Sequence, residues 1–260
     1  MIKTLTATRY IVPLHEGGSL PAVVEAEDGE LYVMKFAGAG QGPKVLIAEL
    51  VAGEIGRALG LRVPELVFLE LDSALAVNER NQEIRDLLKA SVGLNLGLRY
   101  LPSAFAFNPL LQPPTSADLA SMIVWFDAYV TNVDRTARNT NLLLWHDELW
   151  LIDQGAALYF HYDWEDYLAR SQTPFPFIKQ HVLLPLASAI EAADQQLRPR
   201  LTPEVLTAIV DLIPDVWLGD EARFADIAAH RAAYVAYLQS RLAAASSFVQ
   251  EAVNAHAQHV

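Results

Sequence analysis

Three polar side chains with a defined spacing mark the segment between residues 132 and 155. Asp134 is followed five positions later by Asn139, and Asp153 comes after an apolar stretch with a turn in it. Carboxylate and amide oxygens are hard ligands of the kind that Mg²⁺ prefers. A short hairpin would bring Asn139 and Asp153 side by side, so that both could hold a metal ion on the same phosphate groups. The spacing therefore predicts a site for magnesium and a ligand that carries phosphate.

This order of groups resembles the catalytic region of protein kinases. There, a loop aspartate accepts or orients the hydroxyl proton, and an asparagine and a second aspartate hold the metal ions. On that resemblance Asp134 is the expected catalytic base, and Asn139 and Asp153 are the expected metal ligands. The spacing of Asp134 and Asn139 alone would equally describe a loop whose acid caps a turn. The apolar hairpin and the "LIDQG" segment that follow favour the kinase interpretation.

A strand lysine and a helix glutamate are the next parts that such a site needs. Lys35 lies in "LYVMKF" and is similar to the lysine that pairs the α- and β-phosphates in kinases, although an ordinary exposed strand lysine would look the same. Glu49 and Glu54 both lie on the expected helix after "GQGP". On a helical wheel Glu54 falls within the apolar face and Glu49 beside its edge, so the wheel slightly favours Glu54 as the buried acid.

A glycine turn completes the set of candidate groups. Gly17, Gly18 and Ser19 lie in "HEGGSLP", between the first two expected strands. Such a turn could lay its backbone N–H groups over phosphates, but two adjacent glycines also make an ordinary hairpin turn. The phosphate-binding interpretation depends on the other parts occurring in the expected order.

The strand that carries Lys35 is expected in a β-hairpin. Residues 22–26 and 31–36 are rich in apolar and β-branched side chains. Asp28 and Gly29 between them are typical of a tight turn. Lys35 would then lie near the end of the second strand of the hairpin.

The helix that carries the glutamates is expected over residues 44–59. Pro43 suits its first turn, and Gly60 suits its end. The remaining elements expected before about residue 100 are strands over 8–14, 65–71 and 92–102 and an exposed helix over 78–91.

The second half of the chain is expected to be mainly helical. Apolar residues with helical spacing predict a deeply packed helix over 117–132. Further helices are expected near 179–197, 203–212 and 222–256. The sequence thus predicts an α+β, two-lobed protein-kinase-like fold. A β-rich N-lobe would cover residues 1–98, and a mainly helical C-lobe would cover residues 99–260.

Composition limits the classes of function. The chain of 260 residues carries 19 Lys and Arg against 31 Asp and Glu, a formal charge of -12, which disfavours nucleic-acid binding by the protein itself. No apolar run suits a membrane span or a signal peptide, and no cysteine is present, so we expect a cytoplasmic protein without disulfides. The absence of a G-x-S-x-G motif leaves serine hydrolase chemistry without support.

Other polar residues near the loop allow more than one interpretation. Arg135 and Arg138 flank Asp134 and could bind a phosphate or acidic substrate, or form salt bridges within an acidic protein. Asp127, on the preceding helix, is a candidate anchor for the loop through hydrogen bonds. None of the seven histidines shows metal-ligand spacing, so they are interpreted as structural or surface residues.

The chain as a whole resembles HipA-like kinase domains, a branch of the protein-kinase-like superfamily. The similar segments are "AELVAGEIGRALGLRVPELVFLEL", "FDAYVTNVDRTARNTNLLLW", "LWLIDQGAALYFHYDW" and, near the end, "LTPEVLTAIVDLIPDVWL" and "YVAYLQSRLAAASSFVQEA". In this match the helix glutamate is Glu49, against the indication of the wheel. Asn132 takes the place, two residues before Asp134, where ordinary protein kinases carry histidine.

The resemblance implies an ATP- and Mg²⁺-dependent kinase that transfers the γ-phosphate to a hydroxyl group of an unidentified protein or small molecule, with protein Ser or Thr favoured. The sequence departs from the family pattern at two places. Thr136 stands where HipA toxins and lipid kinases usually carry histidine, and the segment at Asp153 reads Asp-Gln-Gly in place of Asp-Phe-Gly. The alternatives are a pseudokinase or nucleotide-binding interaction module, and a small-molecule or lipid kinase. The sequence leaves the oligomeric state open.

Overall fold

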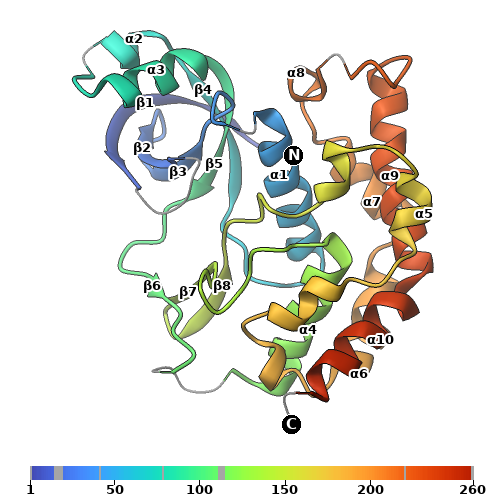
Figure 1. The fold of residues 1–260 in the computed structure, drawn as a ribbon. Coiled ribbons are helices and arrows are strands. Elements are labelled where there is room, and N and C mark those ends of the chain that lie inside the picture. Colours follow the sequence, from blue (N-terminus) through green and yellow to red (C-terminus); the bar gives the residue numbers. More distant parts are fainter. Residues whose placement is uncertain are drawn as a thin grey trace.

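The computed structural model describes residues 2–14, 20–40, 42–77, 79–110, 115–219 and 221–258. Its β-rich part is a closed barrel with the strand order β1-β2-β3-β5-β4, at the upper left of Figure 1. The strands are β1 (Thr4–Pro13), β2 (Ala22–Ala26), β3 (Leu31–Lys35), β4 (Leu66–Leu71) and β5 (Gly93–Arg99). The barrel closes because β1 pairs with β2 on one side and runs parallel to β4 on the other.

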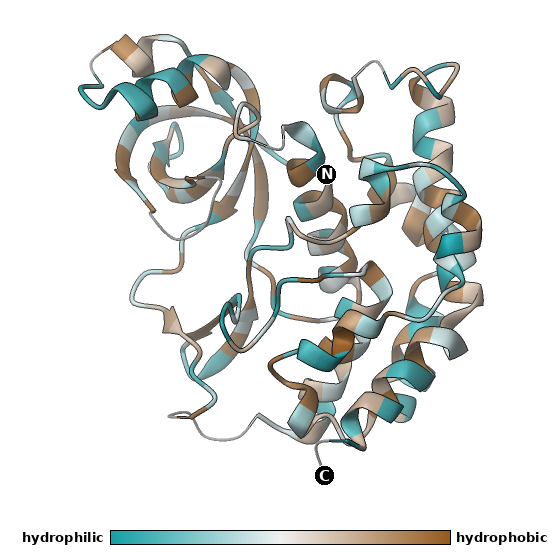
Figure 2. Ribbon diagram, in the orientation of Figure 1, coloured by the Kyte–Doolittle hydropathy of each residue, from teal (hydrophilic) through white to brown (hydrophobic). Residues whose placement is uncertain are grey.

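The predicted β2–β3 hairpin is confirmed. Val23 pairs with Val33, and the turn between the strands places Gly29 in the left-handed region at a φ of 79°. Two short helices, α2 (Ala74–Val77) and α3 (Gln82–Ala90), cover one end of the barrel (Figure 1). Figure 2 shows that α3 is largely hydrophilic while the barrel strands carry many apolar residues, as expected for an exposed helix against a packed barrel.

Helix α1 (Pro43–Ala58) connects the barrel to the rest of the molecule. Pro43 occupies its first turn, and Gly60 follows its end at a φ of 84°, as the sequence predicts. The helix is buried over most of its circumference, because it packs against β5 and against the C-terminal helices α7 and α8. It is therefore an internal element of the fold.

The helical half is built around α4 (Ala117–Val130), which is buried from Ala120 almost without interruption. Ser116 accepts a hydrogen bond from the backbone N–H of Leu119 and caps its first turn. A small sheet of β6 (Phe105–Ala106), β7 (Leu142–Trp145) and β8 (Glu148–Leu151) lies beside it, below the barrel in Figure 1.

The remaining helices are short until the end of the chain. They are η1 (Tyr159–Tyr162), α5 (Tyr167–Ser171), η2 (Pro176–Gln180), η3 (Leu184–Leu186), α6 (Ile190–Leu197), η4 (Arg198–Arg200), α7 (Pro203–Val210), α8 (Asp215–Leu218), α9 (Ile227–Ala243) and α10 (Ala245–His256). No helix in the described ranges is both long and apolar enough to cross a membrane.

Two of the predicted helices are wrong in extent. The helix expected near 179–197 is divided into η2, η3 and α6, because Pro185 cannot donate the backbone hydrogen bond that a continuous helix needs. The helix expected over 222–256 begins only at Ile227 and is broken at Ala244. The two pieces pack on different partners, α9 on α5 and α7 and α10 on α4 and α6, which accounts for the break.

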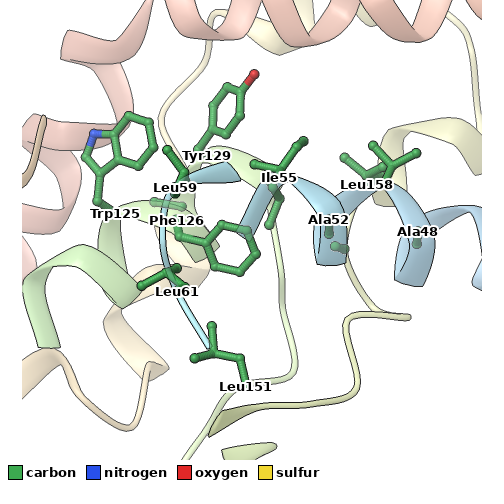
Figure 3. Packing of buried hydrophobic residues seen from close by; sticks show 14 of the residues in the cluster. Ala48, Ala52, Ile55, Leu59, Leu61, Trp125, Phe126, Tyr129, Leu151 and Leu158 are labelled. Atoms are coloured by element: carbon green, nitrogen blue, oxygen red, sulfur yellow. The ribbon is translucent and has the colours of Figure 1, made fainter. Parts of the chain in front are cut away.

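The main apolar cluster joins α1 to the helical half. Ala48, Ala52 and Ile55 of α1 lie in this cluster with Phe126 of α4 and Leu158, all buried (Figure 3). A second cluster fills the barrel and its contacts with α2 and α3. Because the same cluster includes Leu96 of β5, α1 packs against both halves, and the boundary between residues 98 and 99 stays a prediction from the sequence.

Candidate active site

Lys35 lies at the end of β3 and contacts two acids from distant segments. Its Nζ atom is 2.5 Å from Oε2 of Glu49 on α1, and it also forms an ion pair with Oδ1 of Asp153. Lys35 is 6% exposed, and Glu49 is completely buried. These three residues, named here the lysine cluster, bring together side chains that are up to 118 positions apart in the chain.

The helical wheel is wrong in favouring Glu54. This residue forms an ion pair with Arg57 on the same helix at 3.2 Å and is only partly buried. Because α1 is enclosed on most sides, an apolar stripe does not identify the position that faces the barrel. Glu49 is the glutamate that reaches Lys35, as the family resemblance implied.

Electrostatics favour the charged forms of Lys35 and Asp153. Burial alone would lower the pKa of Lys35, but the charges of Glu49 and Asp153 outweigh it and raise that pKa. Burial alone would raise the pKa of Asp153, and the ammonium of Lys35 outweighs it and lowers that pKa. One ammonium group thus faces two carboxyl groups, which leaves the cluster well suited to a further cation.

The loop after α4 is shaped by its own polar side chains. Thr131 ends the helix in the left-handed region at a φ of 57°. Asn132 accepts a hydrogen bond from the backbone N–H of Asp134 at 3.1 Å and donates to Oδ1 of Asp127 at 3.0 Å. Asp127 therefore anchors the loop, as the sequence suggested, and Asn132 transmits that anchor to the residue expected to be the base.

The carboxylate of Asp134 is held by two asparagines. Oδ2 of Asp134 accepts hydrogen bonds from Nδ2 of Asn139 at 2.7 Å and from Nδ2 of Asn141 at 3.3 Å. Asn139 thereby uses its N–H on Asp134, and its carbonyl oxygen remains the kind of hard ligand that a magnesium ion takes. The loop places Asn139 beside Asp134, at the spacing the sequence analysis singled out.

Lys35, Asp134 and Asp153 line one cavity of about 270 Å³. The other residues that line it come from the β3–α1 connection, the first turns of α1 and the segment after Asp153, namely Phe36, Ala39, Gly40, Gly42, Val45, Leu46, Gly155 and Ala156. A side chain at Gly155 would place its Cβ 2.7 Å from Cγ1 of Val45, so the close approach of these segments requires glycine there. Gly17, Gly18 and Ser19 lie outside the described residues.

The donor set fits magnesium bound together with a phosphate ligand. In the ranges that the structure describes, no group of three or more His, Cys, Asp or Glu side chains could hold a metal on its own. Magnesium is commonly bound by one or two carboxylates while water and substrate phosphates complete its shell. The carboxylate of Asp153, which is 42% exposed, and the amide oxygen of Asn139 are ligands of this kind.

Arg135 and Arg138 have different environments. Arg135 is 1% exposed, and its Nε atom is 2.6 Å from Oδ2 of Asp127, so it forms the internal salt bridge that the sequence left as one of two interpretations. Arg138 is exposed at the loop surface. His181 is buried and its Nε2 atom lies 2.8 Å from Oδ2 of Asp127, which makes it one of the structural histidines that the sequence predicts. The two residues are 54 positions apart in the chain, so no local spacing pattern could predict their contact.

The helical half fixes α1 at both ends. Near its start, Nζ of Lys44 donates to the backbone oxygen of His161 at 2.7 Å and to Oε2 of Glu221 at 3.2 Å. Beyond its last turn, the backbone oxygen of Leu59 accepts from Arg200 at 2.8 Å. These contacts fix both ends of the helix that carries Glu49.

The barrel, the enclosed glutamate helix and the paired acids define a two-lobed fold of the protein-kinase type. A family model described as HipA-like kinase matches residues 8–248, and the chain belongs to this family of phosphotransferases. A search of curated sequences gave no significant match.

Similarity to one solved structure supports the fold. The structure of the proinflammatory kinase CtkA from Helicobacter pylori matches with a TM-score of 0.63 and 14% sequence identity, over 99% of this chain and 98% of that chain. The Golgi casein kinase with Mn/ADP bound is similar at a TM-score of 0.47 and 14% identity, over 96% of this chain and 73% of that chain. A likeness as loose as the second carries no weight for function.

Proposed function

We propose that this protein is an active kinase that transfers the γ-phosphate of ATP, with Mg²⁺, to a hydroxyl group. The observation that carries the proposal is the joining of Lys35, Glu49 and Asp153 at the wall of the cavity that Asp134 also lines. Catalysis in such sites consists mainly of positioning and of neutralising phosphate charge. Lys35 provides a cation, Asp153 a metal ligand and Asp134 a base along one cavity, and Asn139 lies beside Asp134.

Each residue has a proposed part in the reaction. Lys35 donates to phosphate oxygens, and Glu49 holds its ammonium group in place. Asp153 and Asn139 hold magnesium, which supplies charge neutralisation on the phosphates when it is bound. Asp134, oriented by the N–H of Asn139, accepts the proton of the attacking hydroxyl.

The remaining assignments are proposals from the sequence alone. Backbone N–H groups of Gly17, Gly18 and Ser19 would cover the phosphates. The acceptor is proposed to be a protein Ser or Thr, with a small molecule as the alternative. The protein is proposed to act in the cytoplasm.

Ligand-dependent melting tests the nucleotide site without knowledge of the acceptor. A ligand at about 100 times its dissociation constant adds roughly 2.7 kcal/mol of stability, which raises the melting temperature visibly. We expect ATP with Mg²⁺ to stabilise the wild type but not Asp153→Ala. Asp86→Ala, which removes an exposed carboxylate on α3, serves as the matched control and should keep the full shift. The absence of any shift in the wild type would favour a role as an interaction module.

A second variant separates binding from transfer. Asp134→Ala should retain the stabilisation by ATP and Mg²⁺ while losing transfer of labelled phosphate, because Asp134 is proposed to act on the acceptor hydroxyl. Full transfer by Asp134→Ala would contradict its assignment as the base.

A further inference from the structure

One buried guanidinium contacts the immediate surroundings of both functional acids. Arg135 directly follows Asp134 in the chain, and its Nη2 atom donates to Oε1 of Gln154, the residue after Asp153, at 2.5 Å. Its Nη1 atom donates to the backbone oxygen of Ile152, the residue before Asp153, at 3.3 Å, and also to the backbone oxygen of Asn141. The neighbours of Asp134 and of Asp153 are thus attached to a single planar group.

The guanidinium is itself fixed in orientation. Oδ2 of Asp127 accepts a hydrogen bond from Nε of Arg135 at 2.6 Å, and Oδ1 accepts one from Nη2 at 3.4 Å. Both side chains of this pair are completely buried. Such two-point pairing with a carboxylate sets the plane of a guanidinium, which a lysine ammonium cannot reproduce. Asp127 lies in the buried part of helix α4. The position of Arg135 is therefore fixed by a helix of the core.

His181 contacts Oδ2 of Asp127, the same oxygen that accepts the hydrogen bond from Nε of Arg135. Its Nδ1 atom accepts a hydrogen bond from the backbone N–H of Leu183 at 3.0 Å, so the proton of the neutral ring lies on Nε2, which donates to Asp127 at 2.8 Å. The backbone fixes the ring as well, because Val182 donates its N–H to the oxygen of Arg135 at 3.1 Å, and Thr136 pairs with His181 as an isolated bridge. We name Asp127, Arg135, Gln154 and His181 the arginine cluster.

Gln154 occupies the middle of the Asp-Gln-Gly segment that departs from the usual Asp-Phe-Gly. In protein kinases the packing of that phenylalanine sets active and inactive arrangements of the metal-binding aspartate. Here the side chain is completely buried and bonded to Arg135. The substitution therefore replaces an apolar contact by a directional one, and it connects Asp153 to the catalytic loop.

We propose that Arg135 is a positioning residue that fixes Asp153 relative to Asp134, with Gln154 as its link to the metal-binding segment and His181 as the residue that orients Asp127. This inference rests on the proposed kinase function and assigns the buried residues that hold its geometry. None of these four side chains lines the cavity. They act through the two acids.

The test measures the affinity for ATP by calorimetry, with Mg²⁺ and with EDTA, in wild type, Arg135→Lys and Arg241→Lys. Arg241 is a matched control, because it is also 1% exposed and donates to backbone oxygens of α4 at Ala128 and Tyr129 without touching residues beside either acid. Loss of an outer partner of a metal ligand typically weakens metal affinity by about 10- to 100-fold, and we expect Arg135→Lys to lose that much of the Mg²⁺-dependent affinity. Arg241→Lys should keep it.

Gln154→Met keeps the proposal testable if Arg135→Lys does not fold. It removes one hydrogen bond, leaves every buried charge paired and preserves the length of the side chain. We expect it to weaken binding in Mg²⁺ and to leave binding in EDTA unchanged, a split that general loosening of the fold would not produce.

The outcomes distinguish the proposed kinase function from the proposed positioning role of Arg135. A wild type that binds ATP neither with Mg²⁺ nor without it overturns the proposed function, and this inference with it. A wild type with Mg²⁺-dependent binding overturns the inference alone if Gln154→Met binds like the wild type, or if Arg241→Lys loses as much affinity as Arg135→Lys.

Discussion

The lysine cluster and the arginine cluster both bury charge, and they differ in how completely it is satisfied. In the lysine cluster one ammonium group serves two carboxyl groups, Asp153 is 42% exposed, and Oε1 of the buried Glu49 has no partner in the described structure. In the arginine cluster both oxygens of Asp127 accept hydrogen bonds, and the ion pair with Arg135 is completely enclosed. The unbonded atom there is Nε2 of Gln154, a neutral amide group, and not a charged one.

The difference separates the function of the site from its support. A buried ion pair whose carboxylate oxygens both accept hydrogen bonds is held in one arrangement, whereas an incompletely satisfied charged group beside a cavity leaves room for a ligand. The lysine cluster faces the cavity where phosphate is proposed to bind, and the arginine cluster lies behind it. Substitutions that remove a charge should therefore reduce stability more in the arginine cluster than in the lysine cluster.

The largest change in stability is expected from Asp127→Ala. It leaves the guanidinium of Arg135 buried without its carboxylate, and breaking a buried pair in this way costs about 3 to 5 kcal/mol. Urea denaturation should show this loss in the free energy of unfolding. The exposed Asp86→Ala variant should stay within about 0.5 kcal/mol of the wild type. A similarly small loss for Asp127→Ala would mean that the arginine cluster does not support the fold.

As the pH falls, the change at the buried His161 should reduce the stability of the fold before the change at Asp153 does. Burial, with the nearby charge of Lys44, lowers the pKa of His161 to about 3. The unfolded chain binds the proton near pH 6.5, so stability falls by about 1.4 kcal/mol per pH unit for this histidine as the pH drops from there toward 3. Asp153, whose pKa is lowered, contributes stability that is lost only below its unfolded pKa of about 3.9.

The variant His161→Asn isolates this effect. Asn can still bond the hydroxyl of Tyr234, which now lies 3.0 Å from Nδ1 of His161, but it does not titrate. Free energies of unfolding measured at pH 6.5, 5.5 and 4.5 should show a slope reduced by about 1.4 kcal/mol per pH unit. An unchanged slope would show that His161 is not the group that titrates.

The smallest change in stability is expected from Glu49→Gln. Burial raises the pKa of Glu49 even against the attraction of Lys35, and glutamine keeps the shape and an acceptor for Lys35, so the free energy of unfolding should change by less than about 1 kcal/mol. Phosphate transfer should fall by about 100-fold, because Lys35 loses the charge that orients it. A stability loss as large as that of Asp127→Ala would remove the distinction between the two clusters.

The sequence predicted most of the elements because their signals are local. The β2–β3 hairpin, α1 and α4 follow from turn residues, capping residues and periodicity within short windows. The parallel pairing of β1 with β4, which closes the barrel, joins residues more than 60 positions apart and leaves no local pattern. The break at Ala244 is invisible in an alanine-rich stretch, since alanine favours helix on both sides of it.

The candidate site was predictable where chemistry fixes spacing. Asp134 and Asn139 are close in the chain and in space, and they could be found together. Glu49 could not be chosen by periodicity, and the family resemblance supplied it. The departure at Gln154 is visible in the sequence, but the contacts of Gln154 and His181 with Arg135 and Asp127 could not be predicted, since they depend on the tertiary fold.

The two apolar clusters show which part of the molecule holds each partner of the Lys35–Glu49 contact. Lys35 is attached to the barrel, while Glu49 is attached to α1, which the helical half holds at both ends. The 2.5 Å contact between Nζ of Lys35 and Oε2 of Glu49 therefore joins a strand of the barrel to a helix whose two ends the helical half holds. The charge at the cavity wall thus depends on how the two halves are placed relative to one another.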